Sequence, residues 1–196
     1  MPITDLSQLD LNRTYTYADY LTWQLKERIE LLRGRIALMS PIPNLNHQKI
    51  VGKLHIYIGH FLLGQTYQAF IAPFDVRLPS SNSQSEAQTY TVVQPDISIV
   101  CDPSKLDEKG CVGAPEIVIE VLSPGNTRRE MREKYSLYEE SGVLEYWLVN
   151  PAHPSLTKYI RNEAGVFIGK QPLTDQEDLA TELLPGFSVE LKKIFG

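Results

Sequence analysis

The chain has 196 residues, of which 42% are hydrophobic and 22% are charged, and its formal net charge is -5 at pH 7. These values are ordinary for a globular protein and predict one folded domain with a well-covered sheet. The net negative charge argues against strong non-specific electrostatic binding of nucleic acid, because proteins that bind in this way normally carry a basic domain. It still permits a local basic rim.

Targeting and redox signals are sparse. No apolar run approaches the roughly 20 residues that span a bilayer, and residues 1–11 lack the basic and apolar regions of a signal peptide. We therefore expect a cytoplasmic protein with no membrane association. Cys101 and Cys111 have neither Cys-x-x-Cys nor zinc-finger spacing, which favours a reduced compartment without structural zinc.

The first 64 residues predict two helices and a hairpin. Thr16 and Asp19 form a capping-box pattern that opens a short helix reaching about residue 26. Strands near 28–33 and 35–40 then flank a glycine turn. From about residue 44 a second helix runs to 63–64, and His47 shares its apolar stripe, which comprises Val51, Leu54, Ile58, Phe61 and Leu62.

The middle of the chain is rich in strand patterns. Strands are expected at 68–72, 74–79, 92–100 and 116–122. The serine-rich segment 80–88 predicts a hairpin tip or a substrate-facing loop.

The remainder combines one helix with further strands. Thr127 and Glu130 form a second capping box that opens a helix to about 141–142. A strand at 144–149 follows, 155–161 pairs with 165–171, and 183–189 forms a short strand ending in a frayed turn. The whole pattern predicts an α/β or α+β fold in which helices flank a mixed sheet.

Three polar residues stand out because their surroundings are apolar. Asp96 follows Pro95 near the start of one strand, and Glu120 interrupts a branched apolar strand that should be covered on both faces. Lys134 shares a helical stripe with Met131 and Tyr138, so it should face the sheet near the end of the Glu120 strand.

Asp96, Glu120 and Lys134 together suggest phosphodiester chemistry. Two carboxylates can hold a Mg²⁺ ion that keeps most of its waters, with Mn²⁺ as a possible substitute. A nearby ammonium can then orient or activate water, or stabilise the pentacovalent phosphate. The alternative is a buried ion-pair network that holds the sheet to its helix.

These residues resemble the PD-(D/E)XK nuclease superfamily, in which an aspartate and a Glu-x-Lys strand bind the metal and activate water. Leu122 occupies the position of the superfamily lysine, and Lys134 looks like a migrated replacement. That arrangement is similar to the Uma-type family of restriction endonucleases. Other stretches between about 14 and 150 also resemble this family in order: 29–35 through 39–41, His47, 119–124, 134–135 and 142–147.

The resemblance implies a restriction-endonuclease-like core at about 14–150, followed by a C-terminal hairpin and tail at 151–196. It implies a metal-dependent endonuclease acting on DNA, in which Asp96, Glu120 and the Val121 carbonyl bind Mg²⁺ and Lys134 positions or activates water. It also places His47 close to the metal centre.

Several further residues have two interpretations. His47 at a helix start is either a neutral donor or base, or a partly buried histidine satisfied by a carbonyl. Glu30 either joins the active site or forms an ordinary ion pair. Three arginines either form a basic rim for nucleic acid or belong to a solvated helix face: Arg128, Arg129 and Arg132.

Two other functions remain open at this point. The chain could be a non-catalytic nucleic-acid or protein-interaction module that retains the nuclease fold, or a hydrolase of some smaller phosphorylated compound with a narrow pocket. Nucleases that cut both strands often act as dimers, so we expect a homodimer with Trp23, Tyr57 and Tyr67 as candidate contacts.

Overall fold

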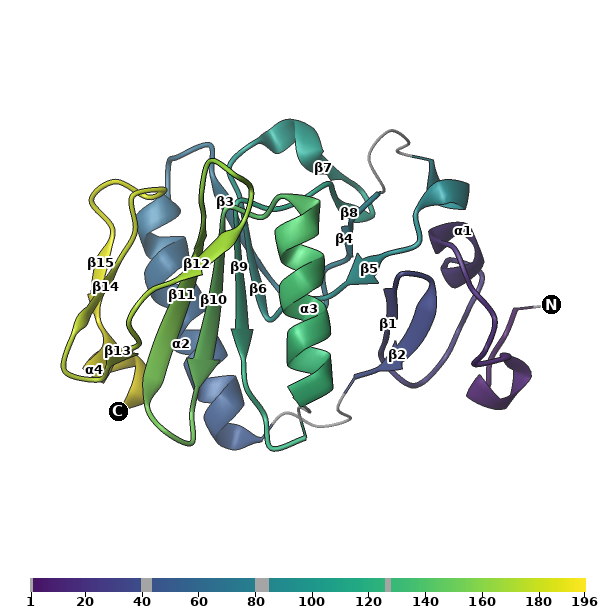
Figure 1. The fold of residues 1–196 in the computed structure, drawn as a ribbon, viewed down its shortest axis with the longest axis horizontal. Helices are drawn as coiled ribbons and strands as arrows, with labels where there is room; N and C mark the ends of the chain where they lie inside the picture. The colour runs from purple at the N-terminus through teal and green to yellow at the C-terminus, as the bar shows by residue number, and fades with distance from the viewer. Residues whose placement is uncertain (1, 40–43, 80–84, 126–127) are drawn as a thin grey trace.

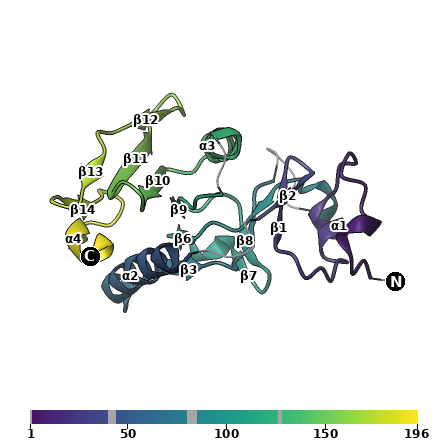
Figure 2. The same ribbon diagram turned by 90° about the horizontal axis from the view of Figure 1, so that it is seen from below.

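The computed structural model describes residues 2–39, 44–79, 85–125 and 128–196. Its central sheet lies between two long helices (Figures 1 and 2). The strands of this sheet are, in spatial order, β12 (Phe167–Gly169), β11 (Ser155–Arg161), β10 (Glu145–Asn150), β9 (Ile117–Val121), β6 (Ile97–Val100) and β3 (Gln68–Ile71), with β13 (Leu173–Thr174) paired to β11. The flanking helices are α2 (Leu45–Leu62) and α3 (Arg128–Ser141).

The alternation of side chains along β9 assigns each residue to one helix. Ile117, Ile119 and Val121 pack in the core cluster that contains the buried face of α2. Val118 packs in the cluster that contains Leu137 and Tyr138 of α3. Because successive side chains of a strand point to opposite faces, Glu120 lies on the α3 side together with Val118.

The register of the central strands positions the polar residues. β9 pairs with β10 in parallel and with β6 in antiparallel orientation, where Ile97 lies opposite Ile119. Continuing the β6–β9 register by one residue brings Asp96 beside Glu120, at the edge where β6 begins and β9 ends. Two residues separated by 24 positions in sequence therefore become neighbours.

A second sheet lies beside the central one. Its strands are, in spatial order, β2 (Arg35–Leu38), β1 (Ile29–Leu32), β5 (Val92–Val93), β4 (Val76–Arg77), β8 (Gly110–Val112) and β7 (Leu106–Asp107). In β1, Leu31 packs in the N-terminal aromatic cluster, whereas Leu32 packs in the α3 cluster. Glu30 has the same parity as Leu32, so its side chain also faces α3.

Shorter elements complete the described fold. They are the helices η1 (Leu6–Gln8), α1 (Tyr17–Tyr20), η2 (Glu86–Gln88), η3 (Pro103–Lys105) and α4 (Leu191–Phe195), and the hairpin of β14 (Asp178–Ala180) and β15 (Ser188–Glu190). Leu191 and Ile194 of α4 are buried in the α2 cluster. None of the helices within the described ranges is both long and apolar enough to cross a membrane.

Most predicted elements are present, but three differ. The first helix ends at Tyr20 instead of about 26, because Trp23 forms a bridge with Ile3. The strand expected at 92–100 is divided into β5 and β6, because Pro95 has no N–H and Gln94 donates its N–H to a side chain. The predicted frayed tail is wrong, since α4 follows β15.

One further hairpin was not predicted, and three predicted features fall on residues that the structure does not describe. The short hairpin of β7 and β8 was not expected from the sequence. The cap at Thr127, the serine-rich residues 80–84 and the segment 40–43 lie outside the described residues.

Candidate active site

Asp96 is held by a backbone amide and a histidine. Its Oδ2 accepts a hydrogen bond from the Val121 N–H at 2.8 Å and lies 3.1 Å from His47 Nε2. His47 comes from the first turn of α2, where the Asn44 side chain caps the helix by accepting from the His47 N–H at 2.8 Å. The carboxylate thus links the start of α2 to the end of β9.

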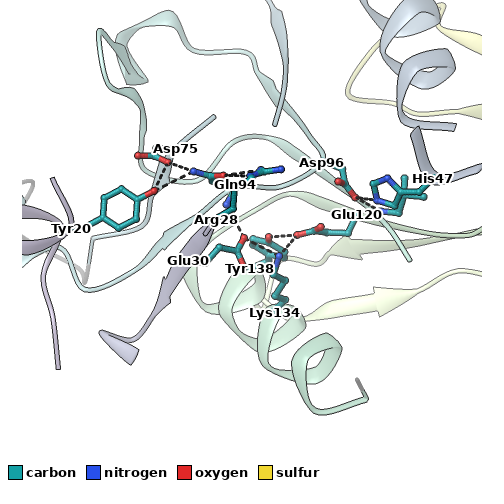
Figure 3. Close-up of polar contacts among 11 residues, drawn as sticks. Tyr20, Arg28, Glu30, His47, Asp75, Gln94, Asp96, Glu120, Lys134 and Tyr138 are labelled. Atoms are coloured by element: carbon teal, nitrogen blue, oxygen red, sulfur yellow. Dashed lines mark hydrogen bonds and ion pairs between the residues drawn. The ribbon is translucent and has the colours of Figure 1, made fainter. Parts of the chain in front are cut away.

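Glu120, Lys134 and Glu30 form the second part of the site (Figure 3). Lys134 Nζ donates to Glu120 Oε1 at 2.9 Å and to Glu30 Oε1 at 3.0 Å. The Tyr138 hydroxyl also donates to Glu120 Oε1, at 2.7 Å. Only 2% of Glu30 and 7% of Lys134 are exposed, so these two members of the network are largely shielded from bulk water.

Burial and the charges nearby have opposing effects on the pKa values of Glu120 and Lys134. Burial raises the pKa of Glu120 to about 7, although the Lys134 ammonium opposes the shift, and the neighbouring Asp96 and Glu30 carboxylates add to it. Burial would lower the pKa of Lys134, but the Glu120 and Glu30 carboxylates outweigh it and hold the pKa well above its ordinary value. Lys134 is therefore an ammonium at neutral pH.

His47 is affected by the same charges. Burial lowers its pKa, but the hydrogen bond with Asp96, the charges of Asp96 and Glu120, and the backbone of Val121 together raise the pKa above its ordinary value. The direction of this shift favours the protonated form of His47 beside the Asp96 carboxylate, which is opposite to the effect expected from the helix dipole alone.

One hollow of about 690 Å³, partly open to solvent, brings the predicted residues together. The five side chains expected to be catalytic all line this hollow. Val121, whose carbonyl was expected to bind the metal, lines it too, and so does Leu122, which occupies the position of the superfamily lysine. These residues are Glu30, His47, Asp96, Glu120, Val121, Leu122 and Lys134.

The donor set of this hollow fits a hard cation in chemical type. Each of Asp96 and Glu120 uses one carboxylate oxygen in the hydrogen bonds above, and its other oxygen has no hydrogen-bond partner among the described residues. Carboxylate and carbonyl oxygens are the ligands that Mg²⁺ prefers. Within the described ranges, no three histidine, cysteine, aspartate or glutamate side chains are already grouped closely enough to enclose an ion.

The predicted basic rim lies on another side of α3. Arg128, Arg129 and Arg132 are exposed and line a neighbouring hollow together with Arg33. Arg33 also pairs with Glu140 at 2.6 Å. The three arginines are thus close to each other but do not line the hollow that contains Lys134.

The aromatic residues expected at a dimer contact are dispersed. Trp23 packs edge-on against Tyr15 with ring centroids 5.0 Å apart, in the N-terminal cluster. Tyr67 packs against the α2 cluster, whereas Tyr57 is exposed on α2.

Three polar residues near the hollow were not expected from the sequence. Tyr138 was assigned only to the apolar stripe of its helix, yet its hydroxyl contacts Glu120. Gln94 donates its N–H to Glu30 Oε1 at 2.8 Å, and Arg28 lines the hollow. A usable signal was the polar Gln94 inside the apolar run that precedes Pro95-Asp96.

Comparison with known proteins gives consistent results. A protein of Synechocystis sp. (strain ATCC 27184 / PCC 6803 / Kazusa), named "Uncharacterized protein slr1290", is 29% identical over 150 residues, which are 75% of this chain and 74% of that protein. The crystal structure of a putative nuclease belonging to DUF820 from Anabaena variabilis has a TM-score of 0.70 and 17% identity, covering 92% of this chain and 97% of that chain.

This structural likeness confirms the predicted fold class, a mixed α+β fold in which helices flank a mixed sheet. The family model Uma2, described as "Putative restriction endonuclease", matches residues 17–192. The resemblance drawn from the sequence motifs is thereby confirmed, and the chain belongs to the Uma2 family.

Proposed function

We propose that this protein is a metal-dependent endonuclease that hydrolyses phosphodiester bonds in DNA. The observation that carries the proposal is the convergence of Asp96, Glu120 and Lys134 in one hollow, from three separate elements. Each of the two acids offers a carboxylate oxygen that has no hydrogen-bond partner among the described residues. These two oxygens are therefore available to a cation that enters the hollow.

The carboxylates of Asp96 and Glu120, with the Val121 carbonyl, would hold Mg²⁺ or Mn²⁺. The ion would supply Lewis acidity to the phosphate and lower the pKa of a water molecule. The Val121 N–H and His47 fix the orientation of Asp96, and Tyr138 fixes that of Glu120, so both acids are pre-organised by the chain itself.

Lys134 acts as a charged donor in this mechanism. Because Glu30 and Glu120 keep it protonated, its ammonium is suited to orient the attacking water and to stabilise negative charge that develops on the phosphate. It is not suited to remove a proton from that water while it remains paired with both carboxylates. Glu30 holds Lys134 and is a positioning residue in this proposal.

DNA is the favoured substrate because the chain belongs to a family described as restriction endonucleases. Arg128, Arg129 and Arg132 offer exposed guanidinium groups for backbone phosphates at a second hollow, which Arg33 also lines. Cleavage of both strands needs one reaction centre for each strand, so we propose that the active form is a homodimer.

The decisive experiment compares the wild-type protein with the Glu120→Gln variant. Titration calorimetry with Mg²⁺ and with Mn²⁺ should detect binding that the variant loses, because the amide removes an anionic ligand. Metal-dependent cleavage of supercoiled and linear DNA should be lost in the same variant.

Glu116→Gln is the matched control, because Glu116 lies four residues earlier in the chain and pairs with Lys105 outside the hollow. It should retain both metal binding and cleavage. Cleavage by Glu120→Gln at the wild-type rate would contradict the proposed site. Failure of the wild type to bind either ion would favour a non-catalytic module with the nuclease fold.

A further inference from the structure

Arg28 lines the same hollow as Asp96, Glu120 and Lys134, but it has a different kind of partner. Its Nη2 and Nε donate to the side-chain Oε1 of Gln94 at 2.8 and 3.3 Å. No carboxylate pairs with Arg28 among the residues that the structure describes. The guanidinium is thus held at the hollow by a neutral acceptor, which orients the cation without neutralising it (Figure 3).

The Gln94 amide is itself fixed in one orientation. Its Nε2 donates to Asp75 Oδ1 at 2.8 Å and to the Tyr20 hydroxyl at 3.2 Å. An ionised carboxylate can only accept hydrogen bonds, so the NH₂ group must face Asp75 and the oxygen must face Arg28. Asp75 in turn accepts from Tyr17 and Tyr20, at 3.3 and 3.4 Å.

Gln94 also belongs to the Lys134 network. Its backbone N–H donates to Glu30 Oε1, the same oxygen that accepts from Lys134. One buried residue therefore positions two cations, Lys134 through the main chain and Arg28 through the side chain. This double contact distinguishes Arg28 from an ordinary surface arginine.

The remaining donors of Arg28 suit a phosphate. A guanidinium carries about five N–H donors, of which Gln94 uses two, so roughly three remain. The planar fork of arginine matches two oxygens of a phosphate group and keeps its charge at any physiological pH. The carboxylates of the hollow would repel a phosphodiester, and an unneutralised guanidinium offsets that repulsion.

We propose that Arg28 binds the non-bridging oxygens of the phosphodiester in this hollow, and that Gln94, backed by Asp75 and Tyr20, positions it. The location of that phosphodiester rests on the proposed function. Arg28 is a substrate-binding residue in this scheme, whereas Gln94 is a positioning residue.

The test uses the dinucleoside phosphodiester TpT as probe and follows arginine Nε–H signals of ¹⁵N-labelled protein by NMR. The signal that disappears in Arg28→Gln should shift as TpT is added. Arg28→Gln should weaken TpT binding roughly tenfold to hundredfold, as expected for hydrogen bonds to a charged group. Arg28 is exposed, so this variant is expected to fold.

Arg35→Gln is the matched control, because Arg35 is an exposed arginine that donates to the Asn12 carbonyl outside the hollow. Its TpT affinity should equal that of the wild type. Gln94→Leu should shift the Arg28 Nε–H signal in the free protein and weaken TpT binding, an effect that a loss of general stability would not produce on one signal.

The outcomes separate this inference from the proposed function. Cleavage of DNA with kcat and KM unchanged in Arg28→Gln, together with no TpT-dependent shift, would overturn the role of Arg28 while leaving the nuclease proposal intact. If no nucleic acid is cleaved but TpT shifts the Arg28 signal, phosphodiester binding by Arg28 stands and the catalytic proposal fails.

Discussion

Lys134 is the residue on which most of the site depends, because two buried carboxylates share its ammonium. Glu30 Oε1 and Glu120 Oε1 lie 3.0 and 2.9 Å from its Nζ. Such an arrangement is costly to assemble and damaging to disrupt, since removal of one partner leaves uncompensated charge in the interior. In the proposed function, the same low exposure would also strengthen the electrostatic interactions between this network and a bound phosphodiester.

Replacement of Lys134 by Met should destabilise the protein by about 3–5 kcal/mol, because Glu30 and Glu120 are left without their cation. Urea unfolding measures this change. The double variant Glu30→Gln with Lys134→Met should recover part of the loss, since one of the two buried negative charges is then removed. A loss below about 1 kcal/mol in the single variant would mean that the network is open to water.

Metal affinity should depend on pH through Glu120. Burial raises the pKa of its carboxyl to about 7, so below that pH the group is mostly protonated and a proton competes with the ion. Affinity for Mg²⁺ should fall about tenfold for each pH unit below 7 and level off above it. Calorimetric titrations between pH 5.5 and 8.5 test this, and a flat profile would exclude Glu120 as a proton-competing ligand.

At the scale of elements, α2 and α3 cover opposite faces of the central sheet (Figure 2), and each supplies side chains to the polar residues near the end of β9. α3 supplies Lys134 and Tyr138 to Glu120, whereas α2 supplies His47 to Asp96. A lysine at position 122 would share the parity of Glu120 along the strand. Leu122 stands there instead, and the helical lysine reaches the hollow that Leu122 also lines.

The start of α2 depends on its cap. Asn44→Ala should destabilise the protein by about 1 kcal/mol, because the His47 N–H loses its acceptor at the helix N-terminus. Asn44→Asp is the control, since it keeps an acceptor and adds a negative charge that the helix dipole favours. Thermal or urea unfolding distinguishes the two, and equal stability of both variants would show that the cap contributes little.

At the scale of the whole molecule, a net charge of -5 coexists with a cluster of exposed arginines. In the proposed function, general attraction to DNA would therefore be weak, and contact with the phosphate backbone would be local. The cluster of Arg128, Arg129 and Arg132 borders a hollow different from the one that holds the candidate catalytic residues. In the proposed function it would position the duplex while other groups act on one phosphate.

Replacing Arg128, Arg129 and Arg132 together by Gln should flatten the dependence of DNA affinity on salt. The slope of log K against log salt should decrease in magnitude by roughly 3, since each phosphate contact contributes about 0.9. Fluorescence anisotropy with a labelled duplex measures it. The control variant removes the same charge by replacing three exposed lysines of the C-terminal segment with Gln: Lys170, Lys192 and Lys193. It should keep the wild-type slope.

Local patterns in the sequence were sufficient to predict the fold class, most strands and the long helices. The alternation in β9, the stripe of α3 and the cap of α2 are set by neighbours within a few residues. The end of the first helix and α4 could not be predicted in this way. They depend on a bridge from Ile3 to Trp23 and on burial of Leu191 and Ile194 against a distant helix.

The same division applies to the candidate site. Asp96 and Glu120 were identifiable from the sequence because each is a carboxylate in an apolar strand segment, and Lys134 because it shares the sheet-facing stripe of its helix with Met131 and Tyr138. The sequence also determined that this chain has no lysine two residues after Glu120. The tertiary structure alone decided that Glu30 shares Lys134 with Glu120, and that Gln94 connects Arg28 to this network. These contacts join residues tens of positions apart, and their geometry arises from the register of strands and the packing of α3, which no local pattern encodes.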